Sequence, residues 1–132
     1  RQRQMCIRDR ITGPLLWRDM RSGDQVCRPE ELGDVILGRK DCAASYHIAV
    51  VVDDAAQGVT HVSRGEDLFP VTGIHRTLQA LLGLPVPQWY HHRLVKDASG
   101  KRLAKRDRSL SLQEMRAAGM RPEDVFRLMR ES

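Results

Sequence analysis

A helical repeat of leucine and isoleucine in the second half of the chain is the feature that most constrains the fold. Its apolar side chains recur at spacings of four, three and one, as on one face of a helix: Ile74, Leu78, Leu81 and Leu82. Thr72 is expected to cap the start of this helix, and Gly83 and Pro85 are expected to end it. Apolar runs at residues 59–63 and 90–96 each predict a strand. Strands that alternate with helices predict an α/β sheet covered by helices.

Residues 46–54 fit either a helix or a strand. Their valines favour a strand, whereas Ser45 is a good N-cap, Gly58 suits the position just past a helix, and the interval fits three turns. We predict a helix, one face of which carries Tyr46, Ala49, Val50 and Asp53. The phenol would then lie at the start of a buried stripe. A β-branched run at residues 34–39 predicts a further strand.

The N-terminal third has weaker patterns. Residues 1–10 are rich in arginine and glutamine without periodicity, and we interpret them as a non-native junction. Residues 11–33 contain turn-forming residues between two short apolar runs, which predicts a hairpin in the end of an insertion or connecting segment. Residues 34–132 are then expected to form the main unit.

Two helices are predicted near the C-terminus. Ser111 and Glu114 form a capping-box sequence, which predicts a short helix that stops at Gly119. Pro122 suits the first turn of a last helix. We expect its apolar residues to point inward: Val125, Phe126, Leu128 and Met129.

Composition and charge narrow the class of protein. Of 132 residues, 41% are hydrophobic and 30% are charged, which is compatible with a packed core. The net charge of +5 suits contact with phosphates. No stretch approaches the roughly 18 apolar residues of a membrane span, and no signal peptide is recognisable. Cys6, Cys27 and Cys42 lack metal-ligand spacing, so we expect reduced thiols in a cytoplasmic protein and no metal site.

Two side chains are candidates for binding a small ligand. Arg64 follows a predicted strand, and ligands of such sheets bind at the carboxyl ends of strands, where a guanidinium can capture a carboxylate through two hydrogen bonds. An ion pair with Glu66, Asp67 or Asp53 is the alternative. Tyr46 could offer its hydroxyl to the same ligand, or it could be a core tyrosine whose hydroxyl is satisfied internally.

The basic run at residues 102–106 is a third candidate. Lys105 could reach the phosphates of a bound nucleotide and stabilise charge during phosphoryl or adenylyl chemistry; the alternative is a solvated basic loop. The histidines do not form a ligand set, because His91 and His92 point to opposite faces of a strand. Adjacent carboxylates at Asp53 and Asp54 diverge on a helix, which disfavours a paired acid/base site.

Two stretches of the chain resemble the glutamate-specific class I aminoacyl-tRNA synthetases. The first is SYHIAVVVDDAAQGVTHVSRGEDL at residues 45–68, and the second continues from LLGLPVP through YHH to GKRLAKRD at residues 81–107. The resemblance is greatest to the shortened members that glutamylate the queuosine base of tRNA(Asp). It implies a partial Rossmann-like class I catalytic fold in which residues 34–132 form the C-terminal half of the catalytic domain, ending in short helices.

The resemblance also implies roles for individual residues. Tyr46 and Arg64 match the family's glutamate-binding tyrosine and arginine. Lys105 matches the second lysine of the KMSKS loop, which contacts ATP and the transition state of adenylylation. The rest of this loop is expected to bind ATP: Arg102, Leu103, Ala104 and Arg106. The implied reaction joins glutamate to ATP, with magnesium, as glutamyl-adenylate and passes the glutamyl group to queuosine-containing tRNA(Asp).

Departures from the family pattern limit what this chain is expected to do alone. Ala104 stands where the family usually has serine. The HIGH-type nucleotide motif, the N-terminal glutamate contacts and the cysteine cluster that holds zinc in many members are all missing from the sequence. We therefore expect the isolated chain to form no adenylate, and the full-length enzyme to be a monomer that does not bind membranes.

Two other functions stay open at this stage. The first is an ordinary glutamyl-tRNA synthetase, which acts on the 3′ end of tRNA; the short tail after Lys105, with no anticodon-binding domain, favours the shortened enzyme. The second is a non-catalytic basic module that holds RNA through arginine and lysine contacts and binds it in a salt-sensitive manner.

Overall fold

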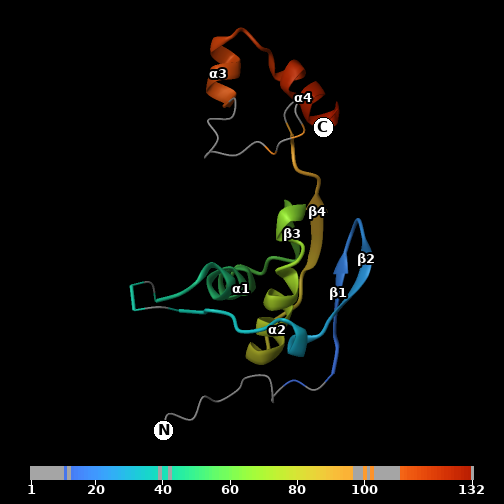
Figure 1. The fold of residues 1–132 in the computed structure, drawn as a ribbon, viewed down its shortest axis with the longest axis vertical. Helices are drawn as coiled ribbons and strands as arrows, with labels where there is room; N and C mark the ends of the chain where they lie inside the picture. The colour runs from blue at the N-terminus through green and yellow to red at the C-terminus, as the bar shows by residue number, and fades with distance from the viewer. Residues whose placement is uncertain are drawn as a thin grey trace. The chain divides into compact units, whose positions relative to one another are not determined.

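The fold is seen in a computed structural model that describes residues 11, 13–38, 40–41, 43–96, 100, 102 and 111–131. Contacts within the chain divide it into two units, Arg1–His92 and Arg93–Ser132. Each unit is described by itself (Figure 1).

The first unit is built on a mixed four-stranded sheet with the order β2-β1-β4-β3. Its strands are β1 (Leu15–Asp19), β2 (Gly23–Cys27), β3 (His61–Gly65) and β4 (Gln88–His92). β3 and β4 are parallel and are joined through helix α2 (Thr72–Leu82), which makes a βαβ unit within the predicted α/β sheet. The predicted strand boundaries differ by a few residues from the observed ones, because β3 starts two residues later and β4 both starts and ends earlier than expected.

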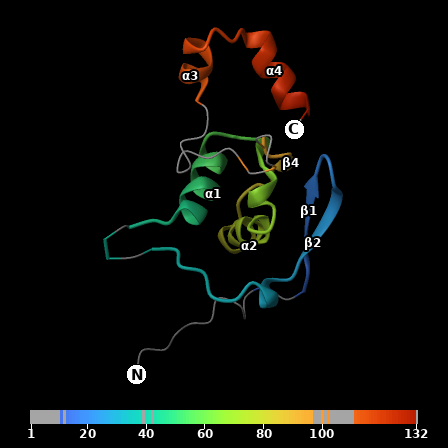
Figure 2. The same ribbon diagram turned by 45° about the horizontal axis from the view of Figure 1, so that its top comes forward.

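β1 and β2 confirm the hairpin expected within residues 11–33. They pair antiparallel from Leu15 opposite Cys27 to Asp19 opposite Gly23. The hairpin also joins the main sheet, because β1 runs parallel to β4 and the Met20 amide donates to the Trp89 carbonyl at 2.6 Å. Figure 2 shows the hairpin beside α2. It therefore contributes a buried edge to the site described below.

α1 (Tyr46–Ala56) confirms that residues 46–54 form a helix rather than a strand. Ser45 occupies the N-cap position but its side chain makes no capping hydrogen bond, and Gly58 has the positive φ (67°) expected just past a helix. The predicted buried stripe is wrong. Val51 is the buried residue of the helix, whereas Tyr46 is 52% exposed, because the inward face is rotated away from the tyrosine.

α2 is confirmed as a helix, but its N-cap and its inward face differ from the prediction. Val71 is the N-cap, and Thr72 is the first helical residue, whose hydroxyl is engaged by Arg64 and the Leu68 carbonyl. The buried positions are mostly polar or small: Thr72, Gly73, His75, Leu78 and Gln79. Leu82, expected inside, is 48% exposed. Gly83 ends the helix in the left-handed conformation, where a residue without a Cβ is favoured.

The strand predicted at residues 34–39 is wrong. Residues 34–38 have no regular secondary structure, and Ile36 is 67% exposed. Leu37 instead accepts a backbone hydrogen bond from Ser45 at the start of α1. A β-branched run becomes a strand only when a neighbouring strand supplies ladder partners.

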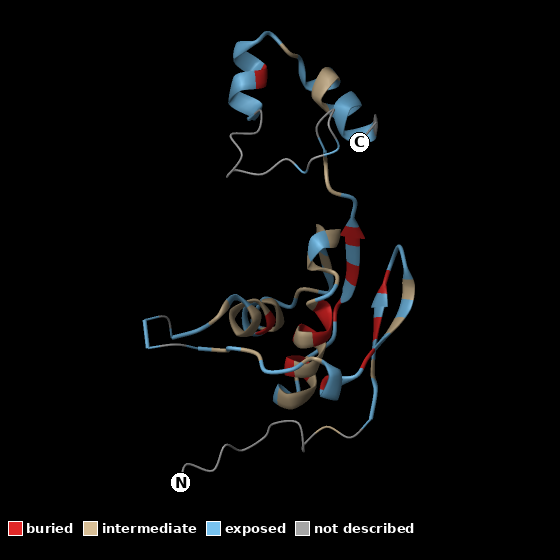
Figure 3. Cartoon of the chain, in the orientation of Figure 1, coloured by how far each residue is buried: buried red, intermediate tan, exposed pale blue. Residues whose placement is uncertain are grey.

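The core of this unit lies between the hairpin, β4 and α2 (Figure 3). Its buried cluster is Trp17, Cys27 and Trp89, and Trp17 packs edge-on to Trp89 with ring centroids 5.5 Å apart. Phe69, just after the 3₁₀ turn Glu66–Leu68, packs against Trp17 at 5.1 Å. A second 3₁₀ turn, Pro29–Glu31, follows β2. The aromatic side chains hold β1 against β4, so polar groups of the two strands are brought together at their ends.

The second unit contains α3 (Leu112–Ala117) and α4 (Pro122–Glu131). The capping box is confirmed, because Ser111 Oγ accepts from the Glu114 amide at 3.1 Å while the Glu114 carboxylate accepts from the Ser111 amide at 2.8 Å. Pro122 opens α4 as predicted. The inward placement of the α4 apolar residues is wrong for Phe126, Leu128 and Met129, which are 60%, 43% and 52% exposed.

Candidate functional site

The site begins with a buried carboxylate at the end of β1. Asp19 has no exposed surface, and its Oδ2 lies 2.6 Å from Nδ1 of His91, which is only 2% exposed on β4. Oδ1 accepts from the amides of Arg21 and Ser22 at 3.0 and 2.7 Å, and Oδ2 also accepts from the His91 amide at 3.2 Å. Four N–H groups therefore satisfy this carboxylate, which is what burial of a charge requires.

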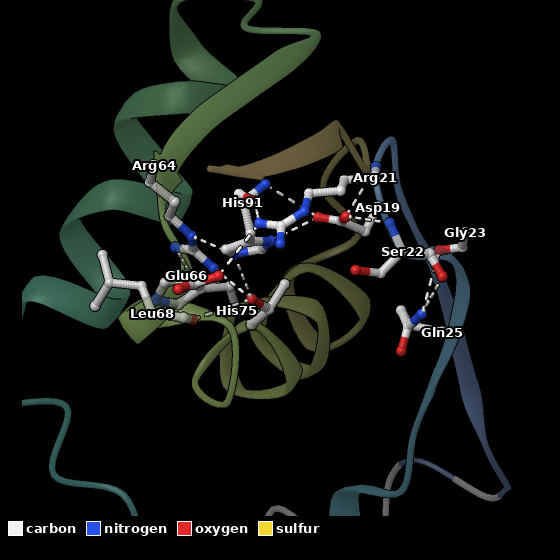
Figure 4. Close-up of polar contacts among 11 residues, drawn as sticks. Asp19, Arg21, Ser22, Gly23, Gln25, Arg64, Glu66, Leu68, His75 and His91 are labelled. Carbon is white, nitrogen blue, oxygen red and sulfur yellow. Dashed lines mark hydrogen bonds and ion pairs between the residues drawn. The ribbon is translucent and has the colours of Figure 1, made fainter. Parts of the chain in front are cut away.

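His91 links Asp19 to Arg64 through hydrogen bonds at its two ring nitrogens (Figure 4). Because Nδ1 carries the proton given to Asp19, Nε2 is the acceptor, and Arg64 Nε donates to it at 3.0 Å. Arg64 Nη2 donates to the Thr72 hydroxyl at 2.6 Å. The hydroxyl also lies 3.2 Å from both His91 Nε2 and the Leu68 carbonyl. The guanidinium is thus fixed from two elements, β4 and α2.

The third hydrogen-bond partner of Arg64 is His75, which is itself hydrogen-bonded to His47. Nη1 lies 2.9 Å from Nδ1 of His75, and since arginine has only donors, this nitrogen accepts. His75 Nε2 then carries the proton and donates to Nδ1 of His47 at 3.1 Å. The Tyr46 ring lies edge-on to His75, with centroids 5.8 Å apart. The structure therefore brings Tyr46 and Arg64 around one imidazole.

A second arginine, Arg21 in the hairpin turn, contacts both β4 and the segment that follows β3. Arg21 Nη1 donates to the His91 carbonyl at 3.1 Å and pairs with Glu66 at 3.2 Å. Glu66, which the sequence offered as a partner for Arg64, therefore pairs with Arg21. Because both side chains of this ion pair are more than a third exposed, it contributes little to stability.

The electrostatics keep both buried histidines neutral and Asp19 charged. Burial, followed by nearby Arg64, His47 and His91, lowers the pKa of His75 to about 3. Burial also lowers the pKa of His91, although the hydrogen bond to Asp19 opposes this. For Asp19, burial acts to raise the pKa, but the hydrogen bonds from His91, Ser22 and Arg21 outweigh it and lower the pKa.

Arg64 keeps its charge in this setting. Burial lowers its pKa, whereas hydrogen bonding and charge interaction with Tyr46, together with the charges of Asp54 and Asp67, raise it. Arginine remains protonated under such shifts. Tyr46 and Arg64 lie on the same side of the sheet, because both contact His75.

The sequence analysis found part of this site. Tyr46 and Arg64 are brought together, whereas Asp19, Thr72, His75 and His91 were missed as its other members. Because His91 and His92 alternate on a strand, one of them was bound to point inward. The sequence analysis used this alternation only to argue against a metal site. Arg102 is exposed and forms a β-bridge with Lys96. The other members of the predicted loop lie outside the described residues: Leu103, Ala104, Lys105 and Arg106.

The part of the chain that the structure describes contains neither a candidate metal-binding group nor a helix suited to span a membrane. Within residues 13–38, 43–96 and 111–131, no group of three histidine, cysteine or acidic side chains is arranged to hold a metal ion. Among the helices that the structure describes, none is long and apolar enough to cross a membrane. Cys27 is a buried free thiol.

Comparison with known proteins defines the class. Residues 1–131 match the family model described as tRNA synthetases class I (E and Q), catalytic domain. The chain therefore belongs to this family, and the mixed sheet with its helices is part of that catalytic fold.

Within this family, the chain is similar to both glutamyl-Q tRNA(Asp) synthetases and glutamate–tRNA ligases. The chain is 53% identical to the glutamyl-Q tRNA(Asp) synthetase of Rhodobacter capsulatus over 120 residues, which are 89% of this chain and 42% of that protein. It is 36% identical to the glutamate–tRNA ligase of Synechococcus sp., over 96% of this chain and 28% of that protein. A crystal structure of glutamate-tRNA synthetase from Elizabethkingia anophelis matches 74% of this chain and 20% of that one, with a TM-score of 0.62 and 30% identity. The chain thus spans less than half the length of these relatives.

Proposed function

We propose that this chain is part of a glutamyl-Q tRNA(Asp) synthetase, an ATP-dependent ligase that activates glutamate and transfers it to queuosine in tRNA(Asp). The observation that carries the proposal is the convergence of Tyr46 and Arg64 on His75 in a chain 53% identical to a protein of that name. The reaction would form a mixed anhydride between the glutamate carboxylate and the α-phosphate of ATP, releasing pyrophosphate.

Arg64 would bind a carboxylate of glutamate. Three of its five N–H donors point to His91, His75 and Thr72. The remaining donors on Nη1 and Nη2, together with the Tyr46 hydroxyl that also interacts with the guanidinium, would face the ligand. Since the guanidinium is already held from two elements, binding would require little reorganisation. Such preorganisation and positioning supply much of the rate in reactions at phosphorus.

The ATP side of the reaction would fall to the basic loop. Lys105 would contact the phosphates and neutralise charge that builds up on pyrophosphate, with magnesium as the second positive charge. This assignment is supported by the family match over residues 1–131 together with the KRLAKRD sequence at residues 101–107. The full-length protein would act in the cytoplasm as a monomer.

Arg64→Ala in the full-length protein tests the assignment. Removal of one partner of a desolvated charge contact costs about 2–5 kcal/mol, so glutamate-dependent ATP–pyrophosphate exchange is expected to fall about 30-fold to several thousand-fold. The matched control is Arg18→Ala, which removes an exposed arginine that pairs with Asp24 on the outer face of β1. Exchange that survives Arg64→Ala at the level of the control would refute the assignment.

RNA binding separates this proposal from a non-catalytic basic module. In a filter-binding assay with tRNA, both arginine variants are expected to lose only a small and similar share of affinity, because each removes one charge. A module would bind RNA in a salt-sensitive manner without any dependence on glutamate or ATP.

An ordinary glutamate–tRNA ligase is the second candidate, and the 36% identity over 96% of this chain supports it. The two differ in acceptor. Incubation of the full-length protein with labelled glutamate and ATP should label queuosine-containing tRNA(Asp) and leave tRNA(Glu) unlabelled. Labelling of tRNA(Glu) at its 3′ end would assign the second candidate instead.

A further inference from the structure

Three neutral groups accept hydrogen bonds from Arg64, and one of them, His91, is itself hydrogen-bonded to the buried carboxylate of Asp19. His91 and His75 accept through imidazole nitrogens and Thr72 through its hydroxyl. Asp19 is linked to Arg64 through the His91 ring, at 2.6 Å on one side and 3.0 Å on the other. The ring therefore lies between a buried carboxylate and a half-buried guanidinium.

Asp19 is a rigid anchor for this arrangement. Its four N–H donors come from the hairpin turn and from β4, and the carboxylate itself is fully buried. The His91 ring is also confined by packing, with centroids 5.0 Å from Phe69 and 6.1 Å from Trp17. If the imidazole turned over, it would lose both its contact with Asp19 and its contact with Arg64 Nε.

We propose that Asp19 and His91 are positioning residues for Arg64, and that they set the affinity of the site for the carboxylate of glutamate. The proposal rests on the proposed function of Arg64. A neutral imidazole between the two charges orients the guanidinium without occupying it as a directly bound carboxylate would, so the ligand's own carboxylate meets an aligned donor pair. Neither residue needs to touch glutamate or ATP.

His91→Phe in the full-length protein is the main test. Phenylalanine keeps a ring to pack against Phe69 and Trp17 but removes both nitrogens. Loss of a hydrogen bond to a charged group costs about 1.5–3 kcal/mol, so KM for glutamate is expected to rise about 10-fold to 150-fold while KM for ATP stays within about 3-fold. Asp19→Asn should act in the same direction, and His91→Phe decides if the asparagine variant does not fold.

Matched controls exist at exposed positions on the other two strands of the same sheet. Asp24→Asn removes a carboxylate from the same hairpin, where it pairs with Arg18 in solvent. His61→Phe changes an exposed histidine at the start of β3, whose Nδ1 lies 2.9 Å from the Thr60 hydroxyl. Both are expected to leave KM for glutamate within about 2-fold, as exposed pairs contribute little.

Arg64→Lys distinguishes positioning from a general structural role. Lysine has no Nε–H and no fork to align, so His91→Phe should add less than about 3-fold to KM for glutamate in that background. Independent, multiplicative effects of the two substitutions would overturn the inference, and so would parallel losses for glutamate and ATP. If Arg64→Ala itself leaves exchange intact, the proposed function fails; if Arg64→Ala abolishes exchange but His91→Phe does not raise KM for glutamate, only the present inference fails.

Discussion

The two faces of the β1–β2 hairpin use similar residues in opposite ways. On the inner face, Asp19 is completely buried and bonded to His91 at 2.6 Å. On the outer face, the neighbouring Arg18 pairs with Asp24 at 2.9 Å, with side chains 61% and 76% exposed. One residue along the strand reverses the face, so adjacent charged positions have unrelated energetic roles. The comparison teaches that the contribution of a carboxylate contact to stability is set here by burial and not by distance.

The largest effect should come from the inner face. Asp19→Ala leaves four N–H donors without their acceptor and removes the carboxylate that holds His91 in place, so the free energy of unfolding should fall by about 3–5 kcal/mol. Denaturant unfolding of the full-length protein, followed by a probe of this domain, measures the change. A loss below about 1 kcal/mol would mean that the two faces do not differ.

A crowded contact between the inner face and α2 should give the next largest effect. A Cβ added at Gly73 would lie 2.9 Å from Cys27 Sγ and 3.2 Å from Leu32 Cδ2. Overpacking costs about 1–3 kcal/mol, of which the better helix propensity of alanine offsets about 1. Gly73→Ala should therefore lower the midpoint of thermal unfolding.

Cys27→Ala supplies the matching test of that contact, because it removes the sulfur that the new methyl group would meet. In the Cys27→Ala background, Gly73→Ala should cost less than in the wild type. Equal costs in both backgrounds would show that the crowding lies elsewhere.

Acid should weaken the inner face through its buried histidines. The pKa of His75 is about 3 in the folded protein and about 6.5 as its ordinary value, so the unfolded chain binds the proton first as pH falls. The contribution of His75 to the free energy of unfolding is fully present above about pH 6.5. It falls toward pH 3 by up to about 1.4 kcal/mol per pH unit. Below pH 3.8 the lowered pKa of Asp19 adds a further loss in the same direction.

Unfolding midpoints measured at intervals from pH 7 to pH 4 check this dependence. His75→Asn should flatten the curve in that range even if it lowers stability overall. A wild-type curve that stays level between pH 6 and pH 4 would contradict the assignment of neutral histidines.

The smallest effect should come from the outer face. Asp24→Asn breaks only a solvent-exposed pair, so the free energy of unfolding should change by less than about 1 kcal/mol, and high salt should have little further effect. Thermal unfolding in low and high salt measures both. A loss comparable to that of Asp19→Ala would remove the distinction between the faces.

Local signals were the reliable part of the sequence. Ser45 and Gly58 bounded α1 correctly against the strand preference of its valines, and the capping box of Ser111 and Glu114 predicted α3. These signals depend on residues within one or two helical turns of each other. The strand expected at residues 34–39 failed because its stability depended on a partner strand elsewhere in the chain.

The candidate site also has a part that the sequence revealed and a part that it did not. Tyr46 and Arg64 could be recognised from residue type and place in the chain, and the structure brings them together. Asp19 and His91, which hold Arg64 in place, could not be recognised as partners from the sequence, since they are separated by 72 positions. The apolar repeat of α2 also concealed its polar inward face, on which Thr72 and His75 contact the guanidinium.

By itself, the sequence determined where helices start and stop and singled out Tyr46 and Arg64 as candidate ligand-binding residues, because caps and strand ends act over a few residues. Only the tertiary structure decided which face of each helix is buried and which of two adjacent charges on β1 is sealed from water. Burial is a property of the packed sheet, and it alone turns Asp19 into an anchor and leaves Arg18 in solvent.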